Sequence, residues 1–172
     1  PKSLTYKTGD EFQSCAYGKT NQMVTFIDST GRSYSLLANS LPSARGNGEP
    51  LSGRLSPPSG AVFIGGMLGE PKQQYLLASD AGYGFIVTVE QAQTRQKAGK
   101  VLLSLSKGAK PLVPFPIKDK DNDWVTMVSN EGRMLLFPAG ELPEMAKGKG
   151  VKLLSIKPAR VANREEYVQD MV

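Results

Sequence analysis

The chain repeats itself with a period of about 50 residues, and no other feature of the sequence limits its fold as strongly. Three short polar turns each end in a glycine, and these glycines, Gly31, Gly82 and Gly132, are 51 and 50 residues apart. A fixed period of this length is typical of arrays in which each structural unit completes its core against its neighbours. We therefore expect a stack of similar units.

A second set of turns combines glycine with lysine or arginine and recurs at the same period. These basic turns lie at residues 45–48, 96–100 and 147–150, and their last shared glycines are 51 residues apart in each case. The pair Leu41-Pro42 recurs as Leu142-Pro143, 101 residues later, which is two periods. Two independent landmarks therefore support the same repeat.

Within each unit the local pattern predicts β-strands. Short runs of β-branched, aromatic and aliphatic residues flank the polar turns, at residues 24–27 and 34–37, 75–78 and 85–89, and 124–128 and 134–137. Further runs occur after the basic turns, at 101–105 and 151–156, and later still at 61–64 and 112–115. Each unit is predicted to form one four-stranded sheet. A brief helix is expected only at residues 90–96, and the prolines at 111, 114 and 116 belong on an edge strand or loop.

The predicted fold is all-β, a propeller-like array of four-stranded blades that forms an incomplete, open arc of about three full blades plus fragments. Residues 1–172 form a single repeat domain, with a blade remnant at about 1–20, repeat units at about 21–70, 71–120 and 121–165, and the start of a next blade at 166–172. A β-sandwich is the alternative, although a sandwich does not require a fixed period. Because the chain begins with Pro1 and its last residues have a strand pattern, we expect a piece of a longer protein.

The composition removes most catalytic chemistry. The chain has no histidine, and Cys15 is its only cysteine, so a disulfide, an imidazole or thiolate metal site and a histidine-activated nucleophile are excluded. We expect no catalytic residue, no cofactor and no metal, and we expect Cys15 to be a small, half-buried residue in a reducing compartment. The apolar stretches are too short to cross a bilayer, so no membrane span is predicted.

The positive charge is concentrated in two stretches of the repeat. The net charge is +5, and no carboxylate occurs between Glu90 and Asp119 or between Glu144 and Glu165. The cations in these stretches cluster at the basic turns and at the strands that follow them. We predict that eleven cations contact phosphate groups: Arg45, Arg54, Arg95, Lys97, Lys100, Lys107, Lys110, Lys147, Lys149, Lys152 and Lys157.

Cations at equivalent places of successive units are expected to lie along one continuous rim, which is a track for a polyanion. The glycines beside them would let backbone N–H groups approach a phosphate as well. No recognition helix, zinc finger or aromatic platform is evident, so binding should be independent of sequence, with a log-log salt slope of about −0.9 per phosphate contact. The alternative is that these are solvated side chains on surface turns. A nucleotide-binding loop is excluded because no Gly-x-x-x-x-Gly-Lys-Ser/Thr is present.

Three segments resemble the C-terminal domain of the A subunit of bacterial DNA topoisomerase IV. They are residues 28–34, 41–53 and 78–85, and the likeness continues at 132–138 and 147–150. The resemblance spans about Lys7 to Ser155. It implies a β-pinwheel, a propeller variant in which strands are exchanged between blades.

The resemblance also implies a function. The chain would bind and bend double-stranded DNA and help position DNA segments for decatenation and supercoil relaxation, while the nucleophilic tyrosine of this ATP-hydrolysing type II topoisomerase would lie outside the chain. The implied partners are duplex DNA, a second copy of the A subunit and the ATPase subunit of the enzyme, and the implied location is the bacterial cytoplasm, on the nucleoid.

Related gyrase domains carry a Gln-Arg-Arg-Gly-Gly-Lys/Arg-Gly box that lets DNA wrap fully, and this sequence has no such box. The departure favours the topoisomerase IV type over gyrase-type wrapping. Two alternatives stay open: a protein-docking propeller whose basic edge is incidental, and a gyrase-type DNA-wrapping domain. A hidden enzyme is disfavoured because no acid, base and nucleophile converge.

Several other residues are expected to have structural roles. Tyr34, Tyr75 and Tyr83 lie in or beside apolar strands and should pack rather than form covalent intermediates. The alternating carboxylates of Asp119, Asp121 and Asp123 lack the glycine and glutamate of a calcium loop, so we expect a solvated hairpin tip.

Overall fold

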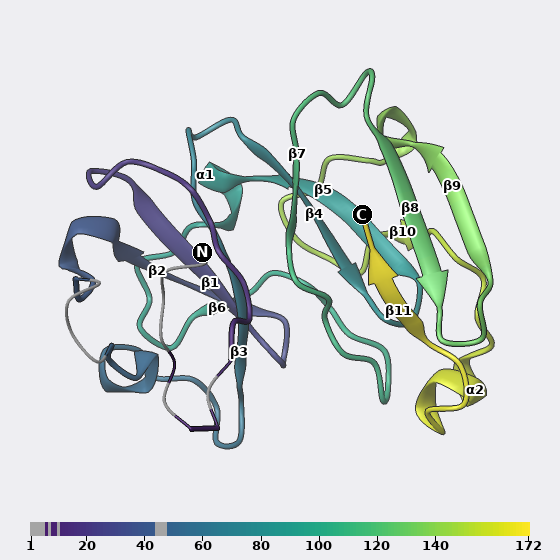
Figure 1. Cartoon of the computed structure of the whole chain (residues 1–172), viewed down its shortest axis with the longest axis horizontal. Coiled ribbons are helices and arrows are strands. Elements are labelled where there is room, and N and C mark those ends of the chain that lie inside the picture. Colours follow the sequence, from purple (N-terminus) through teal and green to yellow (C-terminus); the bar gives the residue numbers. More distant parts are fainter. Residues whose placement is uncertain (1–5, 7, 10, 44–47) are drawn as a thin grey trace.

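Three antiparallel sheets lie side by side in the computed structural model, which describes residues 6, 8–9, 11–43 and 48–172 (Figure 1). Helices are short: α1 covers Val89–Ala92 and α2 covers Pro158–Ala162, and single 3-10 turns occur at Ala38–Ser40, Leu51–Gly53 and Ala139–Glu141. The all-β fold class is therefore confirmed. None of the helices in the described ranges is long and apolar enough to span a membrane.

We number the sheets as blades 1 to 3 in chain order. Blade 1 has the strand order β3-β1-β2-β6, with β1 at Met23–Asp28, β2 at Arg32–Leu37, β3 at Phe63–Met67 and β6 at Lys100–Val101. Blade 2 has the order β10-β5-β4-β7, with β4 at Gln74–Ser79, β5 at Tyr83–Thr88, β7 at Phe115–Ile117 and β10 at Val151–Lys152. Blade 3 has the order β11-β8-β9, with β8 at Trp124–Ser129, β9 at Met134–Pro138 and β11 at Val168–Met171.

The fourth strand of blades 1 and 2 comes from the following repeat unit. In blade 1, β6 pairs with β2 in the register Arg32↔Val101, and in blade 2, β10 pairs with β5 in the register Lys152↔Tyr83. The strand exchange implied by the resemblance is confirmed, and the simpler expectation that each unit forms its own sheet is wrong. A repeat period alone does not say which neighbouring hairpin a short edge strand joins.

The third strands of the three blades occupy equivalent places. β3, β7 and β11 each pair with the first strand of a hairpin, namely β1, β4 and β8. β11 is therefore the third strand of blade 3 and does not begin a next blade, contrary to the expectation for residues 166–172, and within the described ranges blade 3 has no fourth strand. As expected, Pro116 lies on β7, which is an edge strand.

The glycines of the polar turns share a left-handed backbone, with φ of 81° at Gly31 and 78° at both Gly82 and Gly132. A Cβ at Gly31 would lie 2.0 Å from the carbonyl oxygen of Leu103, and one at Gly82 would lie 2.2 Å from that of Leu154. The same carbon at Gly132 would meet no atom within 4 Å. The first two turns therefore need glycine for close approach by the following unit as well as for backbone conformation.

A pair of hydrogen bonds beside each glycine also repeats. The backbone of Ser29 donates to Val62, that of Asp80 to Lys110 and that of Asn130 to Tyr167. In return, the side chains of Ser29, Asp80 and Asn130 accept the N–H of the same three partners, at 3.1, 2.7 and 2.8 Å. Serine, aspartate and asparagine therefore make the same pair of hydrogen bonds at equivalent positions of the three units.

The core consists of two layers, one on each face of blade 2. Tyr75, Leu77 and Phe85 pack with Ile27 and Met67 of blade 1. The opposite face of blade 2, including Leu76 and Ile86, packs with Val125 and Met127 of blade 3. Blade 2 is consequently buried on both sides, as stacked units require. On the outer side of blade 3, Trp124, Met134 and Leu136 are exposed.

Candidate nucleic-acid interface

The basic turns of units 2 and 3 dock onto the preceding blade. Gly99 and Gly150 have φ of 67° and 81°. A Cβ at Gly99 would lie 2.7 Å from the Ser33 carbonyl oxygen, and one at Gly150 would lie 2.1 Å from that of Gly84. Because both turns contact the start of the second hairpin strand of the previous blade, their lysines occupy equivalent places on blades 1 and 2.

The glycine amides of these turns bond inside the protein. Gly99 N–H donates to the Gln96 carbonyl oxygen at 2.9 Å, and Gly148 N–H donates to the Leu102 carbonyl oxygen at 3.0 Å. The expectation that such amides approach a phosphate is wrong for these two. The glycines instead permit close contact between units, so the lysine side chains carry the positive character of the turns.

Two lysines of unit 3 gather around Tyr83 at the start of β5. The Lys149 Nζ lies 3.7 Å from the centre of the Tyr83 ring, and the Lys152 Nζ lies 5.9 Å from it. Lys107 of unit 2 lines the same hollow, of about 280 Å³, together with Tyr83 and Lys149. Cations of two consecutive units therefore meet at the polar turn of blade 2, and all three lysines are exposed.

Units 2 and 3 also come close to each other at Lys100. Its Nζ donates a hydrogen bond to the Gln91 carbonyl oxygen at 2.6 Å. The pKa of the Lys100 ammonium is lowered from its ordinary value, first by burial and then by the positive charge of Lys147. This effect of Lys147 on Lys100 indicates that the end of the basic turn of unit 2 lies near the start of the basic turn of unit 3. Lys147 itself is exposed.

Nine of the eleven predicted site residues carry no ion pair within the described part of the chain. Eight of these are exposed, and Lys100 is half-buried. They are Arg95, Lys97, Lys100, Lys107, Lys110, Lys147, Lys149, Lys152 and Lys157.

The other two candidates differ. Arg54 pairs with Glu49 at 2.8 Å and also donates to the Ser40 carbonyl oxygen, so it holds the loop of unit 1 together. Arg45 lies outside the described residues.

Most other arginines build the structure. Arg32 donates to the carbonyl oxygens of Ala98 and Gly99, at 3.1 and 3.0 Å, and so fixes the basic turn of unit 2 to blade 1. Arg164 pairs with the buried Asp80 of blade 2. The sequence does not distinguish cations that bond within the protein from cations that face solvent. In the structure Arg32 and Arg164 bond within the protein, whereas most of the predicted lysines are exposed.

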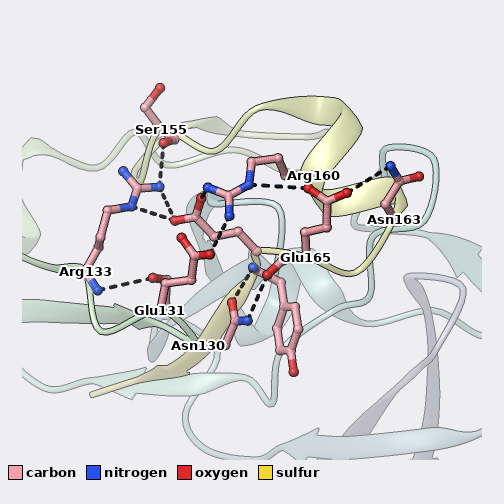
Figure 2. Close-up of polar contacts among 10 residues, drawn as sticks. Asn130, Glu131, Arg133, Ser155, Arg160, Asn163 and Glu165 are labelled. Carbon is pink, nitrogen blue, oxygen red and sulfur yellow. Dashed lines mark hydrogen bonds and ion pairs between the residues drawn. The ribbon is translucent and has the colours of Figure 1, made fainter.

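A network of ion pairs fixes α2 to the polar turn of blade 3 (Figure 2). Glu166 is 2% exposed and accepts from both Arg133 and Arg160. Arg160 also pairs with Glu131 and, at 3.6 Å, with Glu165. Because three carboxylates outnumber two guanidinium groups, this network stabilises the structure and is not an anion site.

The expected structural residues are found in structural places. Tyr34 is fully buried and donates to the Asp28 carboxylate at 2.7 Å, and Tyr75 donates to the Leu68 carbonyl oxygen at 2.8 Å. Asp123 accepts the N–H groups of Lys118 and Asp119 in the loop that joins β7 of blade 2 to β8 of blade 3, so the three aspartates lie in a connection between blades and the expected hairpin tip is wrong. Cys15 is exposed and not half-buried.

The exchanged strands define a β-pinwheel, and the basic turns of units 2 and 3 carry their lysines at equivalent places of blades 1 and 2. Residues 73–110 and 123–166 match the protein family described as DNA gyrase C-terminal domain, beta-propeller. The structure is similar to that of the E. coli ParC C-terminal domain, with a TM-score of 0.88 and 43% identity, over 98% of this chain and 69% of that one. The chain therefore belongs to the family of C-terminal domains found in the A subunits of DNA gyrase and topoisomerase IV.

Curated relatives agree with this assignment. The chain is 54% identical over 168 residues to the A subunit of DNA topoisomerase 4 from Pseudomonas aeruginosa, covering 98% of this chain and 22% of the relative. It is 48% identical over 172 residues to the same protein of Haemophilus influenzae, covering 100% of this chain and 23% of the relative. The chain thus spans less than a quarter of these relatives. A DNA gyrase A C-terminal domain, at 14% identity and a TM-score of 0.69 over 98% of this chain and 53% of that one, shares the fold.

Proposed function

We propose that this chain binds duplex DNA along its basic rim and bends it. The observation that carries this proposal is the gathering of exposed lysines from two consecutive units at the polar turn of blade 2, where Lys149 and Lys152 flank Tyr83 and Lys107 lines the same hollow. Membership of a family named for DNA gyrase and topoisomerase subunits supports the same ligand.

The chemistry of the rim favours recognition of the DNA backbone over recognition of bases. Lysine acts as a compact charge that attracts phosphate from many directions, whereas base reading usually relies on planar, bidentate groups such as arginine. Arg133 and Arg160 are held in internal ion pairs. Binding should therefore depend on counterion release and vary little with DNA sequence.

Bending follows from the side-by-side arrangement of the blades. A straight duplex touches only a short part of a curved row of cations, and bending lets further phosphates make contact. Smooth bending of a short site by 40–90° costs about 1–6 kcal/mol, which additional phosphate contacts offset. The curvature of the rim would therefore become the curvature of the bound DNA.

In the whole protein we propose that the chain presents DNA to a catalytic centre that lies elsewhere in the A subunit of a topoisomerase IV. Its partners there would be a second copy of the A subunit and the ATPase subunit, on the bacterial nucleoid in the cytoplasm. A bent, held segment would help the enzyme to position duplexes for decatenation and supercoil relaxation. The chain itself supplies binding and no catalysis, which is consistent with its lack of histidine.

The triple variant Lys147→Glu, Lys149→Glu, Lys152→Glu tests the proposal. We expect weaker binding to every duplex sequence and a salt slope that is shallower by about 0.9 for each lost phosphate contact. Fluorescence anisotropy of a labelled duplex, titrated at several salt concentrations, measures both quantities. An unchanged circular dichroism spectrum shows that the fold is intact.

A matched control reverses the same amount of charge at the other end of blade 2. Lys72 and Lys118 lie beside the register pair Gln74↔Ile117, opposite the end at which Ser79 pairs with Tyr83, and Lys120 follows in the same loop. The variant Lys72→Glu, Lys118→Glu, Lys120→Glu should lose much less affinity. Equal losses in both variants would refute the placement of the site, and failure of the parent chain to bind duplex DNA at low salt would favour a protein-docking propeller.

A further inference from the structure

The segment from Lys157 to Tyr167 connects blades 3 and 2. Its attachment to blade 3 is the ion-pair network of Figure 2, in which Arg133 of the β8–β9 hairpin and Arg160 of α2 both bind the buried Glu166. Asn130 of the polar turn adds hydrogen bonds to the backbone of Glu165 and Tyr167. We call residues 157–167 the strut, because this network holds them to one blade while they reach the next.

The strut makes its ion pair with blade 2 at Asp80, and Val161 of the strut also packs in the core that blades 2 and 3 share. Arg164 forms an ion pair with the Asp80 carboxylate, whose side chain is 4% exposed. The N–H of Val168, the first residue after the strut, donates to the Asp80 carbonyl oxygen at 2.7 Å. Asp80 is therefore bound by both side chain and backbone from the following blade.

Arg164 adopts an unfavourable backbone conformation to make this contact. With φ of 59° it is the single non-glycine residue of positive φ in the described ranges. Its guanidinium carbon lies 3.9 Å from the centre of the Tyr167 ring, so stacking and the ion pair together hold the side chain. Such strain persists where the surroundings over-determine a residue, and it is often associated with function.

The repeat shows that a carboxylate is not required for the polar turn itself. Ser29 and Asn130 occupy the positions equivalent to Asp80 in blades 1 and 3, and each makes the same pair of hydrogen bonds to its own third-strand partner. The negative charge of Asp80 adds only the contact with Arg164. That contact joins two blades.

The same aspartate positions lysines of the rim. Its Oδ1 accepts the N–H of Lys110 at 2.7 Å, and Lys107 lies in the same loop. This loop packs tightly on the strut, because a Cβ at Gly108 would lie 2.8 Å from the Cα of Ala162. Asp80 thus connects the loop that carries Lys107 and Lys110 to blade 2, the blade on which Lys149 and Lys152 also lie.

We propose that Asp80 and Arg164 are positioning residues that fix the angle between blades 2 and 3, and through it the bend that the rim imposes on DNA. This inference rests on the proposed DNA binding. It assigns to one ion pair the placement of Lys157, the predicted site residue at the start of the strut, relative to Lys107, Lys149 and Lys152 on blade 2.

The test is the double variant Asp80→Asn, Arg164→Gly. Asparagine keeps the acceptor for Lys110, as Asn130 does for Tyr167 in blade 3, and glycine removes the backbone strain at position 164. The variant leaves no unpaired buried charge and does not alter the net charge. Energy transfer between dyes at the two ends of a short duplex measures the bend, and anisotropy measures the affinity.

The matched control removes an ion pair that lies within unit 1. Lys19 and Glu70 pair at 2.8 Å, and the variant Lys19→Gln, Glu70→Gln also leaves the net charge unchanged. We expect the Asp80/Arg164 variant to bind DNA but to lose energy transfer, or to give a broader distribution of it, while the control behaves as the parent does. A bend equal to that of the parent would overturn the inference, whereas absence of DNA binding by the parent would refute the proposed function instead.

A measurement without DNA covers the case in which the double variant binds too weakly for the bend to be measured. Spin labels on Lys72→Cys and Gln169→Cys, both exposed positions, report the distance between blades 2 and 3 when Cys15 is replaced by serine. The distance distribution should broaden or shift in Asp80→Asn alone and in the double variant. An unchanged distribution in folded protein would show that the ion pair does not fix the angle.

Discussion

At the scale of single residues, the polar-turn glycines differ in what surrounds them although their backbones are alike. Gly82 faces the Leu154 carbonyl oxygen, whereas Gly132 faces open space. Alanine at either place must adopt a left-handed conformation, which costs about 1–2 kcal/mol. At Gly82 the clash with the following unit adds to this cost.

We therefore predict that Gly82→Ala lowers the free energy of unfolding clearly more than Gly132→Ala does. Urea unfolding followed by circular dichroism measures both values. Equal losses in the two variants would mean that backbone conformation alone explains the glycines, and that the close approach of residue 154 has no energetic weight.

Tyr34 gives a prediction about alkaline pH. Its pKa is raised, first by burial and then by its hydrogen bond to the Asp28 carboxylate. Because the folded state holds the phenol proton more tightly, its contribution to stability is complete below the ordinary pKa of 10.0 and is lost as pH rises toward the folded value.

Tyr34→Phe should lower the free energy of unfolding by about 1–3 kcal/mol at neutral pH, because a buried carboxylate loses a donor. Above about pH 10 the variant should lose stability less steeply than the parent does. Urea unfolding at a series of pH values checks this, and parallel curves for parent and variant would contradict it.

At the scale of elements, the exchanged segments couple neighbouring blades. Leu103 follows β6 in unit 2, yet it is fully buried in the core that blade 2 shares with Ile27 and Met67 of blade 1. Both Leu102 and Leu103 donate their N–H groups to the Gly31 carbonyl oxygen. One short segment therefore contributes to both the sheet and the core of the preceding blade.

We expect Leu103→Ala to cost about 2–5 kcal/mol. Because units of such arrays contact only their neighbours, the loss should fall mainly on blades 1 and 2. Trp124, the only tryptophan, reports on blade 3, so its fluorescence transition in urea should shift less than the circular dichroism transition.

Leu142→Ala is the matched variant for the core between blades 2 and 3. It should shift the Trp124 transition strongly. Identical shifts of both signals in both variants would show that the three blades unfold as one unit.

The three hairpins could be predicted from sequence because glycine at a fixed period between apolar runs permits few other structures. One short helix could not be predicted, and another differs from its predicted extent. α2 is a single turn that starts at Pro158, too short for any helical periodicity to be visible. The expected helix at residues 90–96 is shorter in the structure, because a capping box of Thr88 and Gln91 starts it and the chain is already extended at Gln93.

At the scale of the whole molecule, the equivalent placement of the basic turns of units 2 and 3 could be predicted from their recurrence, whereas a continuous row of cations and its contact with DNA remain predictions. Which cations are free could not be predicted. Arg164 reaches an aspartate 84 residues away, and Arg32 reaches a turn 66 and 67 residues away. Contacts between residues so far apart in the chain depend on how blades are placed relative to one another, and local patterns do not encode that placement.

The backward donation of β6 and β10 has an evolutionary consequence. A gene that gains or loses one entire repeat changes the number of blades, yet each hairpin that is followed by another repeat still receives an edge strand from it. A break inside a repeat, by contrast, damages two sheets at once. Lineages of this family can therefore lengthen or shorten the array of blades by whole repeats while keeping the same contact between successive units.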